Sequence, residues 1–168
     1  SDYVGVWHLS ENGGANTDVT VHDSTEHGYT GTFNGNNCVI TGLKFNQTIT
    51  SDATQFQRWY IGLFGVIGTG GTVQDLYLKD CSIQVSVSAP YFNLYEGAVA
   101  GQNFGTITAC GVFGEGEISG VRTGGDKSAN AFVGGIAGYN NGIITDSCFI
   151  GIFKQFYNTT KIFTFIFI

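Results

Sequence analysis

Two segments of this chain are near copies of one another, and both contain too much glycine for a helix. They read YEGAVAGQNFGTITACGVFG at 95–114 and FVGGIAGYNNGIITDSCFIG at 132–151. Glycine in a helix interior costs about 1 kcal/mol relative to alanine, so each copy is expected to form short strands and turns. A segment that recurs at a fixed spacing predicts a repeat fold in which each copy forms one structural unit.

Two columns of residues extend the repeat over most of the chain. Both recur with a period of roughly 35 residues: Ile40, Val73, Ile107 and Ile144 form an aliphatic column, and Gly62, Gly97 and Gly134 form a glycine column. Stacked coils of parallel strands place equivalent residues directly above one another, which explains both columns. An antiparallel sandwich is the alternative, but it gives no reason for such columns. We therefore expect an all-β chain that folds as a right-handed parallel β-helix, or solenoid, of about four coils.

The two ends of the chain depart from the repeat. Residues 29–153 are expected to form the solenoid, and residues 1–28 would cap it, because an uncovered coil is an open sheet edge. Residues 154–168 form an apolar C-terminal strand or tail. In this tail Phe163, Phe165 and Phe167 fall on one face of an extended strand, and Ile162, Ile166 and Ile168 fall on the other. Such a strand would pack against its own last coil or pair with another molecule.

The composition argues against two classes of partner. The net charge is −6, from 7 basic and 13 acidic residues, which is unfavourable for binding nucleic acid or an anionic membrane. No apolar run approaches the roughly 20 residues that cross a bilayer, so we expect no membrane span.

Three segments also carry a resemblance to a known family. Residues 29–45, YTGTFNGNNCVITGLKF, are similar to the opening coil of bacterial β-helix surface proteins, and residues 61–83 are similar to the unit that often precedes the main repeat. The two copies quoted above resemble the GLUG repeat of adhesins and IgA-peptidase-type surface proteins. The resemblance covers residues 29 to about 153. It implies a β-helix that serves as a stalk or presenting scaffold outside the cell, with catalysis residing in other domains.

Candidate catalytic and metal-binding residues do not form a recognised pattern. His8, His22 and His27 have spacings that match no zinc motif, so we expect neither a metal site nor a cofactor. Asp75 and Asp146 fall in one column two coils apart, a separation of about 10 Å by strand spacing, which exceeds the carboxylate separation of retaining glycosidases. We assign no catalytic residue and expect no enzyme, and a glycan-cleaving enzyme that uses these two aspartates remains an alternative.

The four cysteines suggest disulfides, and three pairings are open. Cys110 and Cys148 differ in strand parity, which disfavours a bond between them, and Cys110 is expected to be a small core residue. Cys38 and Cys81 cannot be paired from the sequence.

Two sequons provide candidate glycosylation sites at Asn46 and Asn158. Asn46 follows Phe45, which is expected to point inward, so the Asn46 side chain should point outward.

The sequence thus favours an extracellular structural or adhesive module. Its four coils rise only about 19 Å, so length would come from head-to-tail association into filaments or a surface layer. Self-association would use Phe163, Phe165, Phe167, Ile166 and Ile168. A glycan-binding module is the second hypothesis, with Trp7, Trp59 and Tyr139 stacking on sugars.

Overall fold

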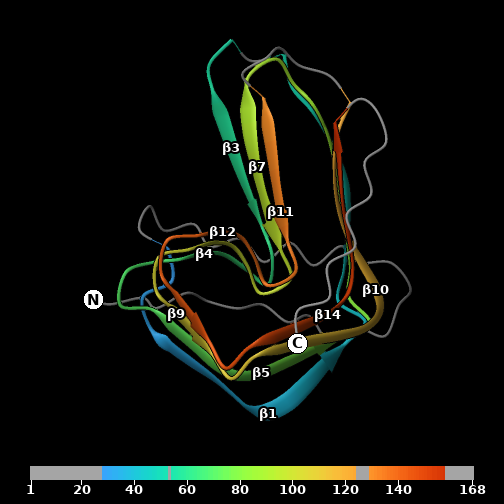
Figure 1. Cartoon of the computed structure of the whole chain (residues 1–168). Helices are drawn as coiled ribbons and strands as arrows, with labels where there is room; N and C mark the ends of the chain where they lie inside the picture. Colours follow the sequence, from blue (N-terminus) through green and yellow to red (C-terminus); the bar gives the residue numbers. More distant parts are fainter. Residues whose placement is uncertain (1–27, 53, 124–128, 158–168) are drawn as a thin grey trace, which may run out of the picture.

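The computed structural model describes residues 28–52, 54–123 and 129–157, in which the chain forms fourteen β-strands and no helix (Figure 1). In chain order the strands are β1 (Thr32–Thr41), β2 (Lys44–Thr50), β3 (Gln57–Ile61), β4 (Phe64–Ile67), β5 (Thr72–Lys79), β6 (Ser82–Ser88), β7 (Phe92–Gly97), β8 (Ala100–Asn103), β9 (Thr106–Thr108), β10 (Gly111–Arg122), β11 (Asn130–Gly134), β12 (Ala137–Asn140), β13 (Ile143–Thr145) and β14 (Cys148–Tyr157). No helix long and apolar enough to cross a bilayer is present among the described residues.

The strands pair in parallel, each with the equivalent strand of the next coil, so the chain is a parallel β-solenoid. An eight-stranded sheet contains β1, β2, β5, β6, β9, β10, β13 and β14. Two smaller sheets have the strand orders β11-β7-β3 and β12-β8-β4. The predicted all-β solenoid is confirmed, but it has about three turns rather than about four. The fourth layer contains only β13 and β14 in the described part of the chain, because β11 and β12 are the last strands of the smaller sheets.

The coil is bent in cross-section and encloses two hydrophobic clusters. Figure 1 looks along the stack and shows β3, β7 and β11 standing away from the β4–β12 layer. One cluster lies between the β4-β8-β12 sheet and the strands β1, β5 and β9, and it contains Phe64, Ile67, Val73 and Leu78. The other lies between the β3-β7-β11 sheet and the strands β2, β6 and β10, and it contains Val85, Val87, Phe92 and Leu94.

Glycine is required at the corner where the chain leaves the β3-β7-β11 sheet. Gly97 pairs with Gly134, and Gly62 follows Ile61, the partner of Glu96, so the predicted glycine column is confirmed. A Cβ atom at Gly97 would lie 2.5 Å from the Ala100 carbonyl oxygen and 2.6 Å from the Ala137 Cα. The backbones of successive coils approach too closely here for any side chain.

The predicted aliphatic column is confirmed in three coils, but the prediction is wrong in the first coil. Val73, Ile107 and Ile144 are paired, as expected. The first-coil partner of Val73 is Phe33, whereas Ile40 pairs with Leu78. The register shifts between Asn34 and Cys38, because the first coil contains extra residues at this kink. Asn36 and Asn37 both adopt positive φ there, a conformation that asparagine tolerates better than most residues.

Candidate functional sites

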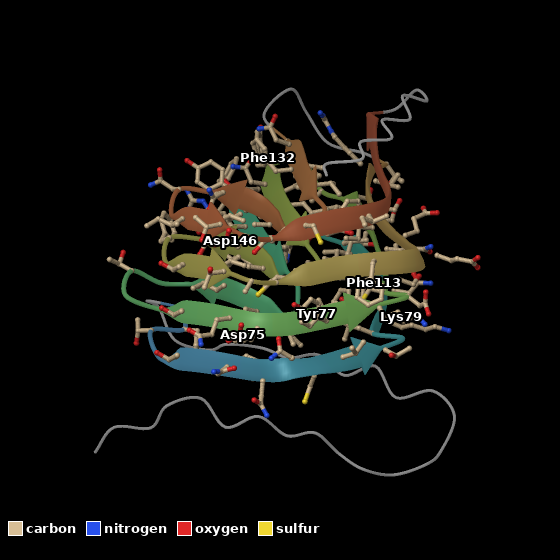
Figure 2. All side chains as sticks on the ribbon, turned by 60° about the horizontal axis from the view of Figure 1, so that its bottom comes forward. Asp75, Tyr77, Lys79, Phe113, Phe132 and Asp146 are labelled. Carbon is tan, nitrogen blue, oxygen red and sulfur yellow. The ribbon has the colours of Figure 1, made fainter. Side chains whose placement is uncertain are left out.

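Large apolar side chains are exposed on the terminal strands. Within the described residues, the exposed large hydrophobic side chains that lie on strands are Val39, Phe132, Tyr139, Ile143 and Ile150, which are 37–57 % exposed. Val39 belongs to β1 in the first coil, and the other four belong to β11–β14, the last strands of their sheets. Figure 2 shows these coils at the bottom and top of the stack. The apolar surface therefore lies where a further coil would continue the ladder.

An aromatic ladder follows the outer face of the β3-β7-β11 sheet. The rings of Tyr60 and Tyr95 stack with centroids 5.2 Å apart, and those of Tyr95 and Phe132 stack at 5.1 Å, with interplanar angles of 10° and 7°. Beside it, the Asn130 side-chain amide donates to Asn93 Oδ1 at 3.1 Å, and the Asn93 amide donates to the Tyr95 hydroxyl oxygen at 2.8 Å. Among the described residues, no further ring stacks on the other face of Phe132. Figure 2 places Phe132 at the top of the stack.

The three residues predicted to stack on glycans do not form one site. Trp7 lies outside the described residues. Trp59 packs against the inner cluster with its ring centroid 5.6 Å from that of Phe92, so it is half-buried on the opposite face of β3 from Tyr60. Tyr139 is exposed, and its ring edge contacts Tyr95 at a centroid distance of 5.8 Å. Of the two described residues, only Tyr139 has the exposure that stacking on a sugar requires.

The two candidate catalytic aspartates lie at backbone kinks. Asp75, Ala109 and Asp146 occupy equivalent positions in successive coils and have φ values of 53°, 51° and 49°. Figure 2 shows Asp75 and Asp146 on one face of the stack with a layer between them. Asp75 Oδ2 accepts a hydrogen bond from the adjacent Gln74 side chain at 3.0 Å. Because aspartate tolerates this left-handed conformation, the kink by itself accounts for both residues.

Glu96 is a buried acid that the sequence patterns did not indicate. It lies on β7 between Ile61 and Val133 of the neighbouring coils, and it is fully buried. Its Oε1 accepts a hydrogen bond from the Ser119 backbone N–H at 3.1 Å, while Oε2 has no hydrogen-bond partner among the described residues. Burial raises the pKa of Glu96 well above the ordinary glutamate value, and the Ser119 hydrogen bond opposes this shift only in part. Burial therefore favours the protonated form of this side chain.

The cysteines are four free thiols, so the expected disulfides are absent within the chain. Cys81 and Cys110 are buried, which confirms Cys110 as a small core residue, and Cys38 and Cys148 are exposed. Burial raises the pKa of Cys81 to about 11, and it also raises the pKa of Cys110. Both buried thiols therefore stay protonated and unreactive at neutral pH.

The outer face of the large sheet carries a mixed surface on its middle layers. Figure 2 shows Tyr77, Lys79 and Phe113 together there. A Cβ atom at Gly111 would lie 2.7 Å from the Tyr77 ring, so glycine makes room for the ring to lie against the next strand. Packing of the Tyr77 ring against Gly111 therefore explains why an aromatic side chain lies on this surface.

The remaining predicted residues fall partly outside the described part of the chain. His8, His22, His27, Asn158 and the tail residues Phe163, Phe165, Ile166, Phe167 and Ile168 all lie outside it. Asn46 is exposed on β2, the orientation that glycan attachment needs. Among the described residues, no three His, Cys, Asp or Glu side chains are grouped so as to hold a metal ion.

The fold and the geometry of its ends define a class: a parallel β-solenoid with apolar terminal coils. Comparisons of the chain with family models, with curated proteins and with solved structures find no match. The sequence did contain a signal for the aromatic ladder, because Tyr60, Tyr95 and Phe132 recur at the spacing of the glycine column. It contained none for Glu96, whose neighbours in the column are aliphatic.

Proposed function

We propose that this protein is a structural or adhesive β-solenoid module that associates head to tail at an extracellular or cell-surface location. The GLUG-repeat resemblance supports the location and the scaffold role. The observation that carries the proposal is the apolar surface on the terminal strands of the large sheet, Val39 at one end and Ile143 and Ile150 at the other.

The internal contacts between coils provide the template for this association. Within the chain, the position of Ile143 is occupied by Thr106 in the preceding coil, and the position of Ile150 is occupied by Phe113. Each of these inner residues has a neighbouring coil on both sides, whereas β1, β13 and β14 pair on one side only within the described residues. A second copy whose β1 added to β13 and β14 would pair the open strand edges and cover the apolar side chains. Such a contact joins different surfaces and does not close, so it propagates into a filament.

Sedimentation velocity and negative-stain electron microscopy of the full chain test the proposal. We expect species larger than the monomer that grow with concentration and show a regular axial repeat. Ile143→Asp should shift assembly to at least about tenfold higher concentration, since it places a charge in the buried contact. Lys79→Asp, an exposed charge change on the inner strand β5, is the matched control and should assemble normally. A full chain that stays monomeric at high concentration would refute head-to-tail association.

Glycan binding is a second candidate function, and the exposure of Tyr139 beside the edge of the Tyr95 ring favours it. Aromatic rings provide the apolar face on which a sugar ring can pack. Tyr139→Ala should abolish retention on immobilised glycans without lowering the melting temperature, whereas Phe104→Ala, which removes a similarly exposed ring elsewhere, should not. Equal retention by both variants would eliminate this function.

A further inference from the structure

We propose that the outer face formed by β1, β5, β9 and β13 binds the surface lattice of ice. This inference is independent of the proposed function, because it concerns the side of the stack, whereas head-to-tail association concerns its ends. Three observations support it: two in-register columns of small side chains, the rigid backbone beneath them, and the absence of charged and aromatic groups in both columns.

Two columns of side chains cross the four coils of this face. The strands β5, β9 and β13 pair in parallel without a register shift, and the first coil joins them in register at Thr32 and Asn34. One column contains Thr32, Thr72, Thr106 and Ile143, and the other, two residues further along each strand, contains Asn34, Gln74, Thr108 and Thr145. Five of these eight residues are threonine, so the face repeats one hydroxyl and one methyl group.

The residue between the two columns faces the core in every coil. Val73 and Ile107 are fully buried, and Phe33 and Ile144 pack against the same hydrophobic cluster. Because successive side chains on a strand point to opposite faces, both columns lie on the outer surface. The threonines of the two middle coils are partly exposed, and those of the first and last coils are exposed.

The backbone and side chains of this face are held in fixed positions. Figure 1 looks along the stack and shows the limb labelled β9 as straight. The Thr145 hydroxyl donates a hydrogen bond to Thr108 Oγ1 at 3.1 Å, and the Gln74 amide donates to Asp75 Oδ2 at 3.0 Å. Threonine is also stiff at χ1, because its Cβ is branched. A ligand would therefore meet groups that are already ordered, and binding would cost little conformational entropy.

The spacing of the columns resembles that of an ice surface. Neighbouring coils lie about 4.8 Å apart, and residues two apart on a strand lie about 6.7 Å apart, so the side chains form a nearly rectangular grid. Water oxygens on the faces of hexagonal ice repeat at similar distances in two perpendicular directions. A threonine hydroxyl both donates and accepts hydrogen bonds, so it can take the place of a water molecule in that lattice.

The chemistry of the face is unfavourable for other classes of ligand. Neither column contains a charged or an aromatic side chain. The carboxylates of Asp75 and Asp146 lie at the kink that borders the face (Figure 2). A charged ligand would find no opposite charge within the columns, and a sugar ring would find no aromatic face on which to pack. An uncharged ligand that repeats in two directions, as ice does, is complementary to this surface.

Ice recrystallisation and thermal hysteresis of the full chain test the proposal. We expect the protein to slow the coarsening of ice grains and to separate the freezing point from the melting point. Thr106→Lys places a charge within the grid and should require at least about tenfold more protein for the same inhibition, since the charge would lose water against the lattice. Thr50→Lys makes the same change at an exposed threonine of β2, outside both columns, and should inhibit as the wild type does.

The outcomes separate the alternatives. Melting temperatures show which variants fold, and Thr145→Lys, at an exposed position of the same face, replaces Thr106→Lys if that variant does not. A loss confined to the variants of this face supports the proposal. A full chain without inhibition or hysteresis would overturn it, and equal losses for Thr106→Lys and Thr50→Lys would overturn the site. Retention on crystalline cellulose without any effect on ice would assign the face to a polysaccharide instead. Sedimentation measures head-to-tail association separately, so the failure of either proposal can be told from the failure of the other.

Discussion

The residue that departs most from its surroundings is Glu96, a fully buried acid in an otherwise aliphatic column. Gly120 makes room for Val133 and for Glu96, since a Cβ atom there would lie 2.5 Å from Val133 Cγ2 and 3.1 Å from Glu96 Oε2. One carboxyl oxygen is unpartnered among the described residues, and protonation lowers the cost of burying it. The acid therefore makes the solenoid more sensitive to base than its composition suggests.

Glu96 should make stability fall as the pH rises. The pKa of Glu96 is raised in the folded state, so unfolding releases a proton once the pH exceeds the ordinary glutamate pKa, and stability is greatest below that value. From there up to the raised pKa, the wild type should lose up to about 1.4 kcal/mol per pH unit relative to Glu96→Gln, which has no such proton. Urea unfolding at pH 5 and pH 8 measures the difference, with exposed Glu115→Gln as the control. Parallel pH profiles for wild type and Glu96→Gln would contradict the assignment.

Ala109 adopts the same positive φ as its equivalents Asp75 and Asp146, but this conformation costs alanine more than aspartate. It has a φ of 51° at the kink where the neighbouring coils have Asp75 and Asp146. The left-handed conformation costs alanine about 1–2 kcal/mol, and glycine is nearly free of this cost. We therefore expect Ala109→Gly to raise the free energy of unfolding by about 0.5–1 kcal/mol. Thermal melting measures the change, and Thr108→Gly, one residue earlier within β9, should be destabilising instead.

At the scale of the elements, the corner after each strand of the β3-β7-β11 sheet fixes how closely coils can stack. Gly97→Ala would place a methyl group within 2.5–2.7 Å of three backbone atoms of the same and the next coil. We expect a loss of about 2–4 kcal/mol in the free energy of unfolding, because backbone cannot move aside as a flexible side chain can. Gly65→Ala is the control, since its Cβ atom would meet nothing closer than 3.6 Å. A Gly97→Ala variant as stable as Gly65→Ala would show that the corner can relax.

At the scale of the whole molecule, stability should depend on protein concentration if the terminal coils stack on one another. Association that occurs only in the folded state stabilises that state by mass action. Over a hundredfold rise in concentration we expect the melting temperature to rise by about 3–8 °C. Ile143→Asp should flatten this dependence, and scanning calorimetry at several concentrations measures it. A concentration-independent wild type would argue against stacking.

The sequence was informative wherever one coil repeats the next. Gly97 and Gly134, and likewise Ile107 and Ile144, are paired residues of the same type, because the same local geometry imposes the same residue type. It misled at Ile40, because the extra residues around Asn36 and Asn37 change the register without changing the apolar pattern on either side. It also misled at Trp59, which was expected to stack on sugars but packs inward against Phe92.

The sequence by itself determined that this chain coils, with what period, and where its corners lie. Those features depend on backbone conformation and on the absence of a side chain, which are local properties that each coil expresses alone. The tertiary structure decided the first-coil register, the separation of the interior into two clusters and the burial of Glu96. These features depend on which residues of different coils meet, and insertions as short as those at Asn36 and Asn37 change that pairing while leaving the local pattern intact.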